Sequence, residues 1–128
     1  MVNLSELLAK DTATVALKHP KTAVPMDAFI TVSGPASDTY RKARQAMTDR
    51  RMAANAAGQP IDAATIEANA RELMAQCVLD WTGLIGPDGA EMPCTVENVR
   101  KVLSTPGLYW LKDQIDEAIN TVGNFLTA

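Results

Sequence analysis

Residues 80–94, DWTGLIGPDGAEMPC, bring three carboxylates and a thiol into one short glycine-containing stretch. A pair drawn from Asp80, Asp88 and Glu91 could exchange protons with a substrate as general acid and base. However, Asp88-Gly89 has the form of a tight turn, in which an aspartate accepts backbone hydrogen bonds. Asp80 lies near the expected end of a helix, and no Lys-Ser/Thr follows the glycines as it does in a phosphate-binding loop. These residues therefore predict a connecting loop rather than an active site.

The sulfur and imidazole groups do not predict a catalytic or metal site. Cys94 could form a nucleophilic pair with His19, the only histidine of the chain, but no local pattern supports this pair. Neither Cys77 nor Cys94 belongs to a CxxC motif, and a zinc site would need these scarce ligands to converge. Cys77 also falls on the apolar stripe of an expected helix, where a thiol packs as a small hydrophobic group. We expect no enzymatic activity, no cofactor and no metal.

The elements around these residues begin with two stretches in which apolar residues recur at every second position. They are residues 12–20, TATVALKHP, and residues 27–34, DAFITVSG. The segment between them contains prolines and suits a turn. The two stretches predict an antiparallel hairpin, and residues 1–10 before it predict a short helical turn or arm.

Helical spacing begins at residue 37. Ser37 is expected to cap a helix that continues without Gly or Pro to Gly58. The weakly apolar face of this helix consists of Tyr40, Ala43, Met47 and Ala54. Asp62 is expected to cap a second helix, which Gly83 and Gly86 end. The apolar stripe of this second helix consists of Ile66, Ala70, Leu73, Cys77 and Trp81.

Two further helices are expected in the rest of the chain. Thr95 is expected to cap the first, and Thr105-Pro106 to begin the second, with the threonine hydroxyl as its cap. The apolar face of the last helix consists of Leu108, Leu111, Ile115, Ala118 or Ile119, Val122 and Leu126. The predicted fold class is α+β and mostly α, with an N-terminal β-hairpin followed by about four helices.

The composition fits a single domain over residues 1–128, with the arm and hairpin in 1–34 and the helical part in 35–128. Of the 128 residues, 47% are hydrophobic and 21% are charged. The net charge of −3 argues against nucleic-acid binding, which usually needs a basic face. No apolar run reaches the roughly 20 residues that span a bilayer, so no membrane contact is expected. The N-terminus lacks the regions of a secretory signal, so we expect a cytoplasmic protein with reduced cysteines.

Charges of opposite sign fall on different helices. The helix that begins after Ser37 carries five of the 12 basic residues: Arg41, Lys42, Arg44, Arg50 and Arg51. The last helix carries an aromatic pair and three acids: Tyr109, Trp110, Asp113, Asp116 and Glu117. Adjacent aromatic residues cannot both point inward, and such rings favour half-buried contact surfaces. These ten residues are either solvated helix faces or candidates for contact with a partner or with a second copy of the chain.

The order of features in two blocks is typical of one protein family. The first block, ATVALKHPKTAVPMDAFITVSGPASDTYRKA, has two extended segments around a Pro-containing turn, then a Ser/Asp-led helix rich in Arg. The second, LDWTGLIGPDGAEMPCTVENVRKVLSTPGLYWLKDQIDEAI, has Trp-x-Gly, an Asp-Gly loop, a Thr-x-Glu-Asn helix start and a last amphipathic helix. In this order the chain resembles tail assembly chaperones of long-tailed, siphovirus-like bacteriophages and prophages. Cys94 stands where an apolar or aromatic residue is usual in that family.

The resemblance implies a non-enzymatic protein that binds the phage tape measure protein and promotes tail tube assembly, in contact with tail tube subunits. It also implies self-association into higher-order multimers, location in the host bacterial cytoplasm and absence from the mature virion. The methionines Met47, Met52 and Met74 would give adaptable surfaces for a long helical client. The alternative that stays open is a structural virion component, such as a head–tail connector or a minor tail protein.

Overall fold

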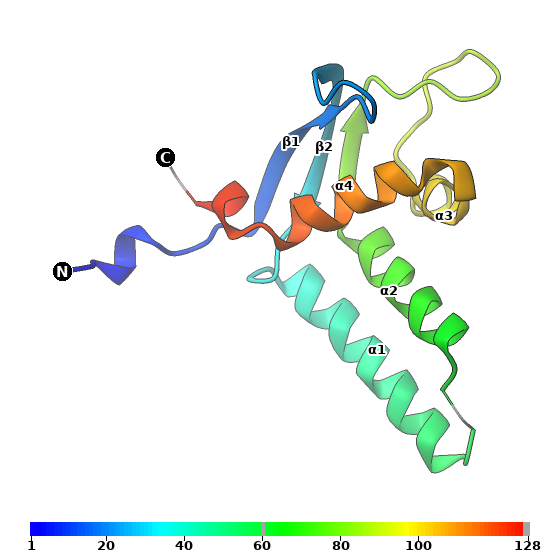
Figure 1. Cartoon of the computed structure of the whole chain (residues 1–128). Helices are drawn as coiled ribbons and strands as arrows, with labels where there is room; N and C mark the ends of the chain where they lie inside the picture. Colours follow the sequence, from blue (N-terminus) through cyan, green and yellow to red (C-terminus); the bar gives the residue numbers. More distant parts are fainter. Residues whose placement is uncertain (60, 127–128) are drawn as a thin grey trace.

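The computed structural model describes residues 1–59 and 61–126 (Figure 1). Within these residues, three strands, four α-helices and three 3-10 turns follow one another. In chain order they are η1 Leu4–Glu6, β1 Thr12–Lys18, β2 Pro25–Ser33, α1 Asp38–Ala56, α2 Ala63–Cys77, β3 Val78–Thr82, α3 Val96–Ser104, η2 Pro106–Leu108, α4 Tyr109–Asn120 and η3 Val122–Phe125. The predicted fold class, a mostly helical α+β protein with an N-terminal hairpin, is confirmed.

The sheet has the strand order β1-β2-β3, with both pairs antiparallel. Its apolar face follows the predicted alternation, since Leu17, Ile30 and Val32 are buried. On the opposite face, the hydroxyl oxygens of Thr14 and Thr31 lie 2.9 Å apart across the strands. α4 crosses the apolar face, as Figure 1 shows, and the main core lies between them.

The third strand shows that the predicted continuation of the second helix to Trp81 is wrong. α2 ends at Cys77, and the chain continues directly into β3, where Trp81 pairs with Ile30. Val, Trp and Thr favour strands, and the second edge of β2 offers backbone hydrogen bonds along its length. Asp80 therefore lies on an edge strand rather than at a helix end. Its Oδ1 accepts a hydrogen bond from the backbone amide of Trp81 at 2.9 Å.

Three of the four predicted helix caps are confirmed. Ser37, Asp62 and Thr95 each accept a hydrogen bond from the amide three residues further along. The prediction for Thr105 is wrong, because its hydroxyl donates to the carbonyl of Lys101 at 2.7 Å. The Thr105 hydroxyl therefore caps the C-terminal end of α3, and the turn η2 separates α3 from the start of α4.

The C-terminal part of the core differs in one respect from the predicted stripe. The buried side chains of α4 are those expected: Leu111, Ile115, Ala118 and Ile119. However, α4 ends at Asn120, and Val122 is exposed. Phe125 of η3 is buried instead, with its ring so close to Gly34 that a Cβ there would lie 2.6 Å from it. The aromatic ring thus ties the C-terminal turn to the end of the hairpin.

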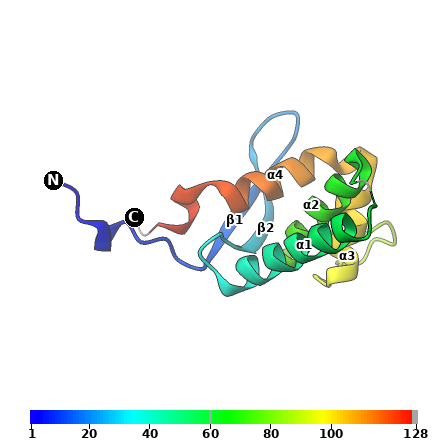
Figure 2. The same ribbon diagram turned by 90° about the horizontal axis from the view of Figure 1, so that it is seen from below.

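α1 and α2 form a helical hairpin that projects away from the sheet (Figures 1 and 2). α1 contains no buried residue, although it is 19 residues long. Its half-buried residues are the predicted face: Tyr40, Ala43, Met47 and Ala54. This face packs mainly on α2. α1 therefore contributes little to the core under the sheet.

The N-terminal arm forms the expected short helical turn, η1, and leads into β1. The amide of Lys10 donates to the carbonyl of Phe125 at 2.7 Å, which places the base of the arm beside η3. Among the described residues, no helix is long and apolar enough to cross a membrane.

Candidate interaction site

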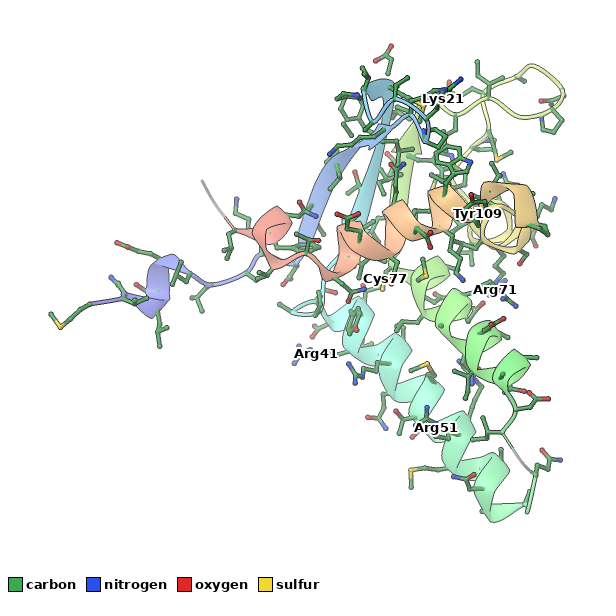
Figure 3. All side chains as sticks on the ribbon, in the orientation of Figure 1. Lys21, Arg41, Arg51, Arg71, Cys77 and Tyr109 are labelled. Carbon is green, nitrogen blue, oxygen red and sulfur yellow. The ribbon has the colours of Figure 1, made fainter. Side chains whose placement is uncertain are left out.

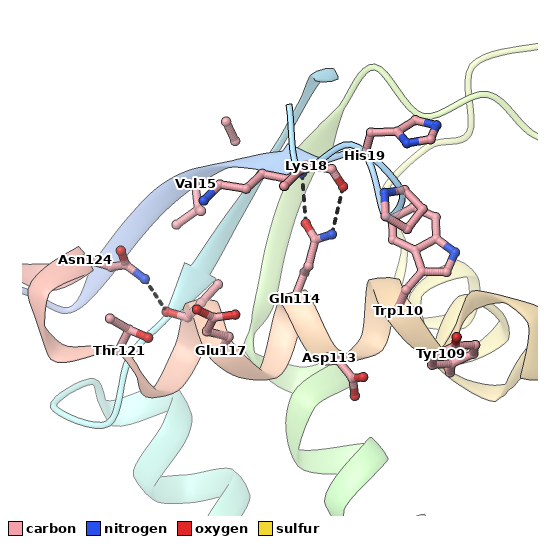
Figure 4. A pocket seen from close by; sticks show the side chains of 14 residues that line it. Val15, Lys18, His19, Tyr109, Trp110, Asp113, Gln114, Glu117, Thr121 and Asn124 are labelled. Carbon is pink, nitrogen blue, oxygen red and sulfur yellow. Dashed lines mark hydrogen bonds between the residues drawn. The ribbon is translucent and has the colours of Figure 1, made fainter. Parts of the chain in front are cut away.

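A groove of about 560 Å³ runs between the edge strand β1 and α4 (Figure 4). Four of the candidate residues of the last helix line it together: Tyr109, Trp110, Asp113 and Glu117. The opposite wall includes Val15 and Lys18 of β1. Asp116 does not belong to this groove, because it lies on the other flank of α4, in a smaller groove with Tyr40 and Met47.

Gln114 connects the two walls of the β1–α4 groove. Its Oε1 accepts a hydrogen bond from the amide of Lys18 at 2.9 Å, and its Nε2 donates to the carbonyl of Lys18 at 2.8 Å. The side-chain amide of Gln114 thus pairs with the backbone amide and carbonyl at the open edge of β1, as the peptide group of a further strand would. The sequence did not reveal this role, because a glutamine on a polar helix face carries no signal for a strand 96 residues away.

The two aromatic residues of the groove point in different directions, as the sequence predicted. Tyr109 is 68% exposed, whereas Trp110 is half-buried. Figure 4 shows Trp110 rising from α4 toward His19 in the β1–β2 turn. The groove therefore offers an aromatic ring at one end and two carboxylates, Asp113 and Glu117, along its helical wall.

The basic residues of α1 are divided between two faces of the helix. Lys42 and Arg50 line a second groove, of about 400 Å³, between α1 and α2. The others do not line it and are exposed: Arg41, Arg44 and Arg51. Figure 3 shows Arg41 projecting from α1 on the side away from α2, and it forms an ion pair with Asp38. The sequence placed these charges on one helix but could not show which of them line the groove.

The basic and acidic helices do not neutralise each other within the chain. In the described ranges, 1–59 and 61–126, the ion pairs are Arg41–Asp38 and Arg100–Glu72. Neither pair joins α1 to α4. Apart from Arg41 and Asp38, which pair with each other within α1, the charged side chains of both helices therefore form no ion pair in the described ranges.

The model of one protein family, the YdaY prophage proteins, matches residues 35–125. This is most of the 128-residue chain, from the turn before α1 to η3. The chain belongs to the YdaY prophage protein family. The matched range contains α1, α2 and α4 but not β1 or β2, so it includes both charged helices of this prophage protein. No curated protein and no solved structure matches the chain.

In this prophage protein, the loop after β3 is built as a connector. Asp88 accepts a hydrogen bond from the amide of Ala90 at 3.1 Å, and Gly89 has a φ of +79°, so the predicted turn is confirmed. The indole Nε1 of Trp81 donates to the carbonyl of Met92 at 2.8 Å and fixes the returning arm of the loop. The carboxylate of Asp88 is thus engaged in holding the turn.

Both thiols are in surroundings that disfavour the reactive thiolate. Burial raises the pKa of Cys77 to about 11, and burial together with the charge of Asp80 raises the pKa of Cys94. Both cysteines are free. His19 accepts a hydrogen bond at Nδ1 from the amide of Lys21, 3.1 Å away. Among the described residues, no group of three or more His, Cys, Asp and Glu side chains is placed to hold a metal ion.

The three methionines expected on the surface differ in exposure. Met52 is 64% exposed and Met47 is half-buried on the seam between α1 and α2. Met74 is buried in the core, so the prediction that it forms part of a binding surface is wrong. The apolar stripe predicted for α2 includes Leu73 and Cys77 but not Met74, so the spacing did not indicate that Met74 is buried.

Proposed function

We propose that this prophage protein is a non-enzymatic tail assembly chaperone, which binds the tape measure protein and promotes tail tube assembly in the host bacterial cytoplasm. The observation that carries the proposal is α1, a 19-residue helix without a buried residue that projects from the body of the protein. A helix with so little core contact has a surface free to pack on a partner. The resemblance of the two sequence blocks to tail assembly chaperones supports the identity of that partner, and the family supports a prophage origin.

The test is co-expression with the protein encoded by the longest neighbouring open reading frame. We expect this protein to raise the soluble fraction of the partner and to co-purify with it. A partner that is equally soluble alone and forms no complex would contradict the chaperone function.

The same proposal includes self-association through the two charged helices. Arg44 and Arg51 are exposed on α1 outside the α1–α2 groove, and the β1–α4 groove carries Asp113 and Glu117. Contact between unlike surfaces of two copies is head-to-tail and can propagate into rings or spirals. Because exposed charges are screened by salt, association should weaken as ionic strength rises. Light scattering at low and high salt measures this, and a strict monomer at both would exclude multimers built on these charges.

A structural virion component, such as a head–tail connector or minor tail protein, predicts a different location. Such a component persists in purified particles, whereas a chaperone leaves before the virion is complete. Mass spectrometry of particles purified after prophage induction distinguishes the two. Stoichiometric recovery of the chain from intact particles would replace the chaperone proposal with the structural one.

A further inference from the structure

The groove between α1 and α2 has a shape and charge that specify a class of ligand. Its floor is formed by small or apolar side chains, Ala43, Ala46 and Leu73, and Lys42 and Arg50 stand along the α1 wall. We propose that this α1–α2 groove docks an acidic amphipathic helix of the client protein. The inference rests on the proposed chaperone function and names the surface and the segment through which it acts.

The floor of the groove favours a helix as the occupant. Helices pack at axial distances of roughly 8–10 Å, and small side chains at the contact allow the closest approach. Ala43 and Ala46 provide such a contact on α1, and Leu73 of α2 is only half-buried. A third helix lying along the hairpin would cover Leu73 and complete a three-helix arrangement. α1 is about 28 Å long at 1.5 Å per residue, which is enough to support a helix of several turns.

The charges along the groove favour an acidic occupant. α1 carries five basic and two acidic side chains in a chain whose net charge is −3. Neither Lys42 nor Arg50 belongs to an ion pair in the part of the chain that the structure describes. They are eight residues apart, so they stand roughly 12 Å apart along the helix axis. Carboxylates about two turns apart on a docked helix would contact both Lys42 and Arg50. These two contacts would attract the helix and also fix its orientation in the groove.

The one carboxylate in the groove does not cancel this preference. Glu72 of α2 accepts two hydrogen bonds from Arg100 of α3, at 2.9 Å and 2.6 Å. The hydrogen bond from Arg100 is the main reason that the pKa of Glu72 lies below its ordinary value. Glu72 is therefore paired mainly with Arg100 of α3, and Arg50 contributes only a smaller Coulombic attraction to it. On the other flank of the α1–α2 seam, the smaller groove contains Asp116, so an acidic helix is favoured on the Lys42–Arg50 side.

The test compares two charge reversals of equal size. Lys42→Glu/Arg50→Glu changes the groove, and Lys21→Glu/Lys101→Glu, the control variant, changes two exposed lysines that do not line it by the same net charge. The probe is a fluorescein-labelled 20-residue peptide with leucines along one face and glutamates flanking them, and its dissociation constant is measured by anisotropy at low salt. We expect the groove variant to bind at least about tenfold more weakly than the wild type, and the control variant within about threefold.

Two further peptides test the ligand class. A scrambled peptide of identical composition removes the apolar stripe, and a peptide with lysine in place of glutamate reverses the charge. Both should bind at least about tenfold more weakly than the probe. Equal losses in the groove and control variants, or equal binding of the lysine peptide, would overturn the inference, as would no binding of the probe to the wild type.

Capture of the co-expressed client separates this inference from the proposed function. If the wild type and the groove variant retain the client equally, the chaperone function stands and the α1–α2 groove is not its docking site. If the groove variant alone loses the client, both are supported. If the wild type captures no client, the proposed function fails, and the peptide measurements still decide what the groove binds.

Discussion

Replacing Trp81 with Phe tests the junction of the third strand and the following loop. The indole is 5% exposed, lies on the strand position opposite Ile30 and donates to the carbonyl of Met92 at 2.8 Å. Phenylalanine keeps an aromatic ring in the core but removes the donor and part of the ring. The substitution therefore affects the packing of the ring in the core and the hydrogen bond to Met92. One side chain can make both interactions only if β3 pairs with β2 and the following loop folds back onto β3.

The expected loss can be worked out from these two interactions. A partly buried carbonyl that loses its donor costs about 1–2 kcal/mol. The missing ring atoms leave a small cavity and remove apolar contact, at about 1–2 kcal/mol more. We expect the free energy of unfolding to fall by roughly 2–4 kcal/mol, a large part of the 5–15 kcal/mol typical of a domain. The midpoint of thermal unfolding should fall by roughly 6–15 °C.

Urea unfolding followed by far-UV circular dichroism measures the change. Leu79→Ala is the matched control, because Leu79 lies on the same strand but is 45% exposed. We expect it to cost less than about 1 kcal/mol. If Trp81→Phe destabilises the protein no more than Leu79→Ala, the indole does not join the sheet to the loop, and the reasoning about β3 is refuted.

Three further predictions address single positions. Gly83→Ala should destabilise the protein by more than about 2 kcal/mol, because Gly83 has a φ of +79° and a Cβ would lie 2.2 Å from a backbone carbonyl. Gly89→Ala, with a similar φ but open space, should cost only about 1 kcal/mol in the same urea assay, and equal losses would contradict the close approach at Gly83. The hydrogen bond from Arg100 is the main cause that lowers the pKa of Glu72. The Glu72–Arg100 pair therefore stabilises the fold fully above pH 4.5, the ordinary pKa of a glutamate, and this stabilisation is lost as the pH falls through the lowered pKa. The difference in unfolding free energy between wild type and Arg100→Gln should therefore shrink below pH 4.5, and a constant difference would contradict the linkage. Because Cys77 is fully buried and its pKa is raised to about 11, DTNB at pH 8 should modify this thiol only as fast as the surrounding structure opens, and rapid labelling seen by peptide mapping would show that it is accessible.

The features that could be predicted from the sequence are those determined by neighbouring residues. The caps at Ser37, Asp62 and Thr95 follow from one side chain and an amide three residues away. The Asp88-Gly89 turn is equally local. β3 was missed because residues 78–82 continue the apolar spacing of α2, and only the edge of β2, far away in the chain, makes a strand more favourable.

The same distinction applies to the candidate surfaces. Composition placed basic residues on α1 and acidic residues on α4, but the β1–α4 groove depends on the contact between Lys18 and Gln114, 96 residues apart. Helical periodicity also did not show which of the α1 charges would face α2. At Thr105 two helix ends compete for one hydroxyl. The sequence predicts that it caps the start of the last helix, but it instead donates to the carbonyl of Lys101 at the end of α3.

The near absence of buried contacts on α1 separates the stability of this helix from that of the rest of the chain. Unfolding of α1 breaks mainly its seam with α2, so its amides should exchange with solvent through local openings that leave the sheet intact. A bound partner would raise the free energy of those openings, and slower exchange in α1 would report occupancy. Under the proposed chaperone function, the surface of α1 is therefore free to change in sequence to suit a different client, while the sheet and α4 keep the chain folded.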